Sequence, residues 1–154
     1  MKKEAMERLK ILIFRVRDRY FALASSNAKE IVDSYGNLKT IFYGGKALKG
    51  LMSFEGDVVS VLDTPFIIDI KENGEDPLIL LCKEKGMERG VGITISEVKG
   101  MKVITVSMIN PSQEKDAPYI TGFIREEDGE TENTVALIDL KRFLDYAETK
   151  IDKL

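Results

Sequence analysis

The sequence contains no histidine and only one cysteine among its 154 residues. Without histidine the chain can form neither a serine–histidine–aspartate triad nor a histidine-ligated metal site, and it cannot pass on a phosphoryl group from a histidine of its own. The single cysteine, Cys82, excludes a disulfide within the chain and fits a reducing compartment. These absences remove many common catalytic designs and favour a protein that is not an enzyme.

Long apolar segments and an excess of positive charge are also missing. No segment approaches the ~20 apolar residues that a membrane helix needs, and the first residues, Met1–Glu4, lack the apolar stretch of a signal peptide. The net charge is −3, so no overall positive field favours binding to nucleic acid or to an anionic membrane. We therefore expect a cytoplasmic protein that neither binds nucleic acid nor inserts into a membrane.

The chain is 44% apolar and 32% charged, which is enough to form the core of one globular domain. Short apolar or alternating segments between polar turns predict strands over residues 11–16, 20–23, 58–62, 78–82, 90–95, 103–106, 119–124 and 134–138. The first two strands form a hairpin, and a charged loop joins 78–82 to 90–95 in a second one. Residues 73–77 are the strongest turn cluster and the expected boundary between two halves.

Helices are expected at two places. Asn27 followed by Glu30 is typical of a capping box and predicts a short helix over about residues 28–34. Near the end of the chain, Asp139 is a candidate cap for a helix with one apolar stripe, formed by Leu140, Phe143, Leu144, Ala147 and Ile151. Residues 54–57 predict a tight bend, and the acidic segment 125–132 predicts a loop. The residues expected to be buried are Phe14, Val59, Val61, Ile93, Ile95, Leu137 and Phe143.

The two halves of the chain resemble each other. Each begins with a strand–turn–strand hairpin, and each later contains a strand that ends in aspartate, Asp63 or Asp139. The pattern predicts a mainly β fold with short helices, in which residues 1–154 form a single domain of two intertwined subdomains, roughly 11–76 and 77–150.

Catalytic motifs are incomplete. Gly44-Gly45-Lys46 lacks the spacing of a phosphate-binding loop, so a turn is the better interpretation. Asp63 and Asp139 each follow an apolar strand, which leaves open a phosphoacceptor aspartate or an aspartate that ends a strand or caps a helix. Cys82 lies in a continuous apolar segment and is expected in the core rather than as a nucleophile. We therefore predict no catalytic residue, no metal site and no cofactor.

The order of the elements and five short motifs resemble the CheW family over about residues 10–145. The opening hairpin is followed by Lys29-Glu30-Ile31-Val32, and the central signature Gly-Val-x-Asn-Leu-Arg-Gly corresponds to residues 50–56. Residues 91–98 resemble the family's Val-Gly-x-x-Val-Asp-x-Val. Residues 119–122 and 136–140 resemble its Tyr-x-x-Gly and its closing strand–helix junction.

The resemblance implies two SH3-like five-stranded β-barrels packed around a shared core, with a C-terminal helix. It also implies a non-catalytic adaptor in chemotaxis, which couples the regulatory domain of a CheA-type histidine kinase to the cytoplasmic tip of a chemoreceptor. The receptor's helical hairpin would bind in the groove between the barrels. Rigid barrels offer strand edges and loops for such docking. The residues expected to bind partners are Glu30, Ile31, Phe54, Glu55, Gly56 and Asp57.

The sequence departs from the family at the central signature. Glu55 replaces the arginine that is commonly tied to receptor contact, Asp57 follows the next glycine, and Ser53 replaces the asparagine. A glutamate cannot offer the forked donors with which arginine binds carboxylates, so we expect Glu55 to face a partner of different charge. A second interpretation therefore stays open, in which the chain is a diverged CheW-like module that serves another signalling or regulatory protein.

Overall fold

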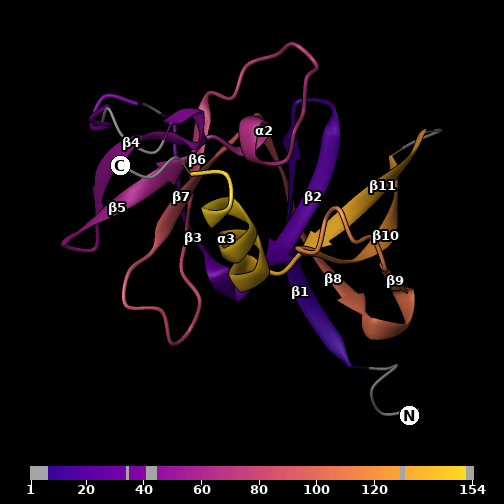
Figure 1. Ribbon diagram of the computed structural model, residues 1–154. Coiled ribbons are helices and arrows are strands. Elements are labelled where there is room, and N and C mark those ends of the chain that lie inside the picture. The colour runs from indigo at the N-terminus through magenta and orange to yellow at the C-terminus, as the bar shows by residue number, and fades with distance from the viewer. Residues whose placement is uncertain (1–6, 34, 41–44, 129–130, 152–154) are drawn as a thin grey trace.

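A computed structural model describes residues 7–33, 35–40, 45–128 and 131–151 of the chain, which form two β-sheets around a shared core (Figure 1). The strands are β1 (Arg8–Val16), β2 (Arg19–Ala24), β3 (Ala28–Val32), β4 (Leu48–Phe54), β5 (Asp57–Leu62), β6 (Leu78–Cys82), β7 (Val91–Ile95), β8 (Glu97–Thr105), β9 (Asn110–Pro111), β10 (Ile120–Asp128) and β11 (Thr131–Ile138). The helices are α2 (Thr64–Ile67) and α3 (Leu140–Glu148), and short 3-10 turns are η1 (Ser25–Asn27), η2 (Gly45–Ala47) and η3 (Val106–Met108). The predicted mainly β fold with short helices and a C-terminal helix is confirmed.

Each of the two sheets contains strands from both halves of the chain. One has six strands in the order β8-β1-β2-β11-β10-β9, and the other has five in the order β3-β6-β7-β5-β4. The expected boundary near residue 76 does not separate them, because β6 and β7 join the sheet of β3, β4 and β5. Parallel pairing of β2 with β11 and of β5 with β7 joins segments that are far apart in sequence. Segments 11–76 and 77–150 are thus interleaved.

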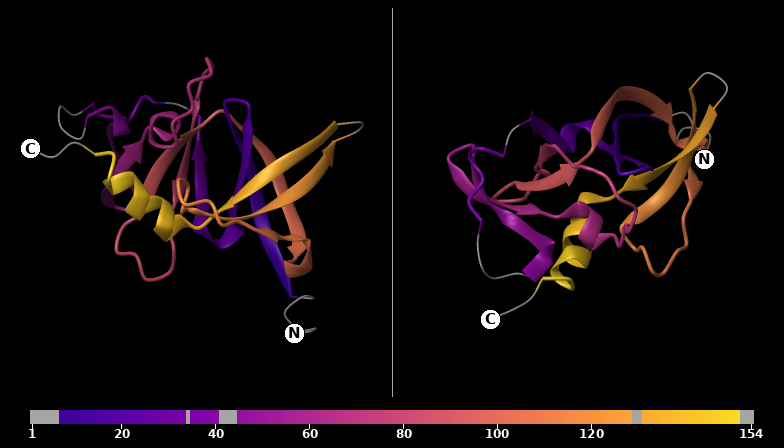
Figure 2. Two further views of the ribbon diagram at one scale, coloured as in Figure 1. Left: turned by 45° about the vertical axis from the view of Figure 1, so that its right-hand side comes forward. Right: turned by 90° about the horizontal axis from the view of Figure 1, so that it is seen from above.

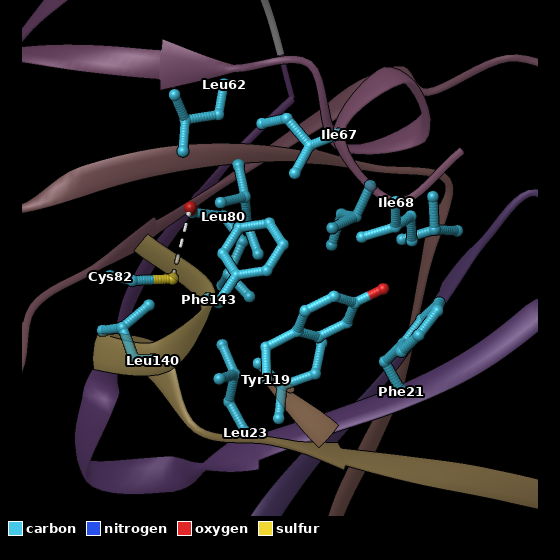
Figure 3. Close-up of a cluster of buried hydrophobic side chains, with 14 of the residues drawn as sticks. Phe21, Leu23, Leu62, Ile67, Ile68, Leu80, Cys82, Tyr119, Leu140 and Phe143 are labelled. Atoms are coloured by element: carbon cyan, nitrogen blue, oxygen red, sulfur yellow. Dashed lines mark hydrogen bonds between the residues drawn. The ribbon is translucent and has the colours of Figure 1, made fainter. Parts of the chain in front are cut away.

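The core explains why several strands are apolar along their whole length. On β1, Leu12 and Phe14 contribute to a cluster shared by both sheets. Ile11 and Ile13, on the other face of the strand, contribute to a second cluster that is formed mainly by side chains of the six-stranded sheet. Because both faces of the strand are buried, apolar residues follow each other without alternation. A third cluster lies inside the five-stranded sheet. Figure 3 shows part of the shared cluster, and all seven predicted core residues are buried.

Both strand-ending aspartates cap helices. The Asp139 carboxylate accepts a hydrogen bond from the backbone N–H of Arg142 at 3.0 Å, where α3 begins. The Asp63 carboxylate accepts one from the backbone N–H of Phe66 at 3.4 Å, where the short helix α2 begins. Helix α3 lies between the two sheets (Figures 1 and 2), and its Leu140, Phe143 and Ala147 are buried. The helix-cap interpretation of the two aspartates is confirmed.

The helix predicted over residues 28–34 is wrong, because residues 28–32 form strand β3. Ile31 pairs with Leu80 and Val32 pairs with Ile79 of β6. The local capping signal is outweighed by this long-range pairing, which supplies ladder hydrogen bonds along an apolar strand of the core. Residue 34 lies outside the described residues.

The loop predicted over residues 125–132 is also wrong. Strand β10 continues to Asp128 and β11 starts at Thr131, so most of the acidic segment lies in a hairpin. Arg125 bonds Glu132 across the hairpin at 3.2 Å, and Glu126 binds Lys102 of β8. These opposite-charge pairs let a charged sequence remain in strand conformation. Figure 2 shows the ends of β10 and β11 extending beyond the other strands of the six-stranded sheet.

A polar network joins the turn after β1 to the junction between the sheets. The Arg17 guanidinium donates to both carboxylate oxygens of Asp76, with Nη2 2.9 Å from Oδ2. The hydroxyl of Ser96, between β7 and β8, donates to the same carboxylate at 3.0 Å. The Tyr35 hydroxyl donates to the Asp76 carbonyl at 2.5 Å. The segment around Asp76 is therefore held by side chains from three other parts of the chain.

Candidate partner-binding surface

Four of the six predicted partner-binding residues form the turn between β4 and β5. Phe54 pairs with Asp57, and the two residues between them have positive φ, 52° at Glu55 and 80° at Gly56. Positive φ at both central positions is the type I′ turn, which fits the twist of a two-residue hairpin. The predicted tight bend is confirmed. Gly56 adopts this conformation without steric cost, whereas Glu55 holds it despite its Cβ atom.

The members of the turn differ in what they offer to a partner. Phe54 is buried in the cluster inside the five-stranded sheet, and its ring lies so close to Gly90 that a Cβ there would approach it to 2.9 Å. Phe54 therefore anchors the turn instead of adding to its surface. Glu55 and Gly56 are exposed, and Asp57 is half-buried. The neighbouring Val58 adds an exposed apolar side chain.

Glu55 has a cationic neighbour within the chain. Its Oε2 lies 3.7 Å from the Lys83 ammonium, and the Glu55 side chain is 51% exposed. An ion pair this exposed contributes about 0–1 kcal/mol to stability. Glu55 therefore remains available for contact with a partner, with Lys83 beside it.

Glu30 and Ile31 lie on β3, an edge strand of the five-stranded sheet, whereas β4 lies at the other end of that sheet. Both side chains are exposed, and Ile31 keeps 44% of its surface accessible. Among the described residues, no hydrogen bond or ion pair links either of them to the β4–β5 turn. The connection is indirect, since the backbone N–H of Lys83 donates to the Asn27 carbonyl just before β3. The hydrogen bonds and ion pairs of the described residues thus do not link the six residues directly into one site.

An exposed apolar group on the six-stranded sheet was missed in the sequence. Met101 and Val103 of the edge strand β8 and Met108 just beyond it are exposed, the first two by more than half. The signal was present in the alternation of residues 97–103, where odd positions face outward. Met101 and Val103 on β8 and Ile31 on β3 thus place apolar side chains on an edge strand of each sheet.

Cys82 and the segment Gly44-Gly45-Lys46 are the remaining sequence candidates for chemistry. Cys82 is fully buried, burial raises the pKa of its thiol to about 12, and the thiol donates to the Leu80 carbonyl. Gly45 and Lys46 lie in η2, and Gly44 is outside the described residues. Within the described part of the chain, no group of three or more cysteine, aspartate or glutamate residues could hold a metal ion. No helix there is long and apolar enough to cross a bilayer.

Comparison with known proteins agrees with this architecture. Residues 10–148 match the family profile described as "CheW-like domain". No curated protein sequence matches the chain. Among solved structures, the crystal structure of the scaffolding protein TtCheW from Thermoanaerobacter tengcongensis superposes with a TM-score of 0.73 at 19% sequence identity. The match covers 86% of this chain and 90% of that one, so the likeness extends over both sheets.

Proposed function

The chain belongs to the CheW-like domain family, and we propose that it is a non-catalytic adaptor that couples a CheA-type histidine kinase to chemoreceptors. The observation that carries the proposal is the family match over residues 10–148, supported by the likeness to a scaffolding protein across the whole fold. The proposed partners are the regulatory domain of the kinase and the cytoplasmic tip of a receptor. The proposed location is the cytoplasm.

The exposed surface supports a role in docking. Edge strands leave backbone donors and acceptors unpaired, and β3 and β8 both combine such an edge with exposed apolar side chains. Ile31 lies on β3, while Met101 and Val103 lie on β8. Rigid sheets that carry such residues suit an adaptor, because little ordering is needed when a partner binds. No catalytic group is required for this role.

The charge at the β4–β5 turn supports a second candidate, a CheW-like module that serves a different signalling or regulatory partner. At the position of the family's arginine, this chain presents Glu55 next to Lys83. A carboxylate there repels an acidic receptor helix and attracts a basic one. Because charge pairs at an interface mainly set specificity and association rate, this single change favours a partner of opposite charge.

The test measures binding of the full chain to the source organism's kinase regulatory domain and to each of its receptor tips. We expect binding to the kinase domain and to at least one tip. Glu55→Arg should change affinity for a tip by about tenfold at low salt, and the change should shrink at high salt. The substitution should leave the backbone strain of the turn about the same, because glutamate and arginine both carry a Cβ at this positive φ.

A charge-swapped double variant, Glu55→Arg with Lys83→Glu, is the matched control, because it restores the local ion pair while reversing the charge of the turn. If affinity changes with the single variant and returns with the swap, the local pair matters rather than contact with the tip. If affinity for every tip is unmoved at low salt, Glu55 is not at the interface. If the chain binds neither kinase nor receptor, the adaptor proposal fails and the second candidate stands.

A further inference from the structure

A cavity of about 770 Å³ opens beside the shared core, and none of the six predicted partner-binding residues lines it. Strands β2 and β11, the segment before β10, the residue pair after α2 and the end of α3 form its wall. Its aromatic lining residues are Tyr20, Phe21, Tyr119, Phe123 and Tyr146. The ring centroids of Tyr119 and Tyr146 lie 5.0 Å apart and the ring planes are tilted by 52°, so the two rings pack against each other.

The Tyr119 hydroxyl is a polar group left without a partner. The residue is only 5% exposed, and its hydroxyl forms no hydrogen bond with any residue in the described part of the chain. Figure 3 shows the hydroxyl pointing towards the space between Ile68 and Phe21, two further lining residues. Burial, and then the nearby Tyr146 and Glu114, raise the pKa of this hydroxyl to about 12 against the opposing effect of Arg19, so it stays neutral. The oxygen is not one of the described side-chain atoms that are both buried and unpaired, so it is open to the cavity and can bond a ligand there.

The rim of the cavity carries more carboxylates than cations. Asp18, Asp69, Glu114 and Asp116 line it, and none of them forms a salt bridge with a described residue. The lining also includes Glu132, which is paired with Arg125, and Arg19, which is 3.4 Å from a Glu72 carboxylate oxygen. Five carboxylates and two cations, Arg19 and Lys150, therefore line the cavity, which leaves its lining negatively charged.

The chain already places one cation against the aromatic lining. The Lys150 ammonium lies over the Tyr146 ring, 5.4 Å from its centroid, at the edge of the cavity. Cations bind aromatic faces through the negative face of the ring, and the interaction strengthens where water is excluded. Arginine suits such a place better than lysine, because its planar guanidinium stacks on a ring while its five N–H donors reach several acceptors.

We propose that this cavity binds an arginine side chain carried by an exposed segment of a partner protein. The guanidinium stacks on Tyr119 or Tyr146, donates to the Tyr119 oxygen, and is surrounded by the carboxylates of Glu114 and Asp116. The site is separate from the β4–β5 turn and does not depend on the adaptor function. It gives the protein a second contact, specific for a basic partner.

The test uses the full chain and short acetylated, amidated peptides in which glycine alternates with arginine, lysine or glutamate. Binding is followed by calorimetry and by tyrosine fluorescence. The sequence has no tryptophan that would mask the tyrosine signal, and three of its five tyrosines line the cavity. We expect the arginine peptide to bind best, the lysine peptide more weakly and the glutamate peptide not at all. Affinity should fall as salt is raised.

Three variants separate the parts of the site. Glu114→Gln with Asp116→Asn should weaken the arginine peptide about tenfold, since two charge contacts are lost. Tyr119→Phe keeps the ring and should weaken binding about threefold without lowering the melting temperature, because the hydroxyl it removes had no partner. Glu97→Gln is the control, since this carboxylate lies on β8 outside the cavity and should leave binding unchanged.

Several outcomes would overturn the proposal. Equal binding of the arginine and glutamate peptides, or equal binding by the Glu114/Asp116 double variant and the original chain, would show that the cavity does not recognise a cation. Free N-acetyl-arginine amide binding as tightly as the peptide would show that the ligand is a small molecule and not a protein segment. A loss of affinity in the Glu97→Gln control as large as in the double variant would show that only net charge matters.

Discussion

Replacing Asp76 by alanine should destabilise the protein strongly, because this carboxylate is the acceptor for two separate segments. It receives hydrogen bonds from the Arg17 guanidinium, at 3.1 Å from Nε and 2.9 Å from Nη2, and from the Ser96 hydroxyl at 3.0 Å. The side chain of Asp76 is only 9% exposed and that of Arg17 20% exposed. The Asp76→Ala variant leaves the guanidinium and the hydroxyl mostly buried, without their acceptor.

The magnitude follows from the burial. Removing one partner of a buried ion pair typically costs ~3–5 kcal/mol, because the other charge stays buried and unpaired. Arg17 retains some contact with water and a bond from Nη1 to the Glu72 carbonyl, at 2.6 Å. We therefore expect a loss of about 3 kcal/mol, at the lower end of that range. For a chain of this length, that loss corresponds to a fall of about 6–12 °C in melting temperature.

Thermal and urea unfolding followed by circular dichroism measure this loss, and Glu97→Ala provides the matched control. Glu97 also accepts from an arginine, with Arg15 Nε at 3.1 Å, but these side chains are 49% and 32% exposed. An exposed pair of this kind should contribute less than about 1 kcal/mol. If Asp76→Ala costs no more than Glu97→Ala, the network around Asp76 does not hold the junction between the sheets and the reasoning fails.

Three further predictions concern the core and the apparent reactive residues. Val61→Ala should cost about 2–4 kcal/mol in urea unfolding and Val58→Ala less than about 0.5 kcal/mol, because Val61 is buried and Val58 is exposed on the same strand; equal costs would contradict the core assignment. Incubation with a phosphorylated chemotaxis kinase should leave no stable label on Asp63 or Asp139, since both carboxylates cap helices, and mass spectrometry of the intact chain would reveal any phosphoryl group. Cys82 should react with a thiol reagent only at the rate of unfolding. Because burial raises the pKa of its thiol to about 12, the folded state keeps a proton that the unfolded state loses, so this group's contribution to stability should fall as pH rises from about 9 to 12.

The strands that the sequence predicts well are those whose side chains are buried on both faces. Leu78–Cys82 is continuously apolar and forms β6 in the middle of the five-stranded sheet. Strand β3 could not be recognised in the same way, because three of its five residues are exposed at the edge and their pattern does not alternate. Only pairing with β6, about fifty residues further along the chain, decides its conformation. Local signals such as Asn27 and Glu30 contain no information about that partner.

The short motifs are informative about the fold because their glycines are required by backbone geometry. Gly56 has φ of 80° in the β4–β5 turn. A Cβ at Gly50 would lie 2.3 Å from the Lys39 carbonyl oxygen, so the bridge between Lys39 and Leu51 requires glycine there. Such residues specify how the chain folds and not what it binds. The cavity beside Tyr119 is assembled from several distant segments and has no counterpart in any single motif.

The parallel pairing of β2 with β11 has a consequence for the order in which the molecule can be built. Phe21 is synthesised well before its neighbour in the sheet, Ala136, which lies 115 residues further along the chain. Until then the first hairpin has an open edge, and neither sheet can close over the shared core. Folding of this domain must therefore await the synthesis of β11, and a nascent protein stalled before that point would expose an unpaired apolar strand to chaperones. A chain released before β11 would lack both the neighbour of β2 and the helix that covers the core between the sheets.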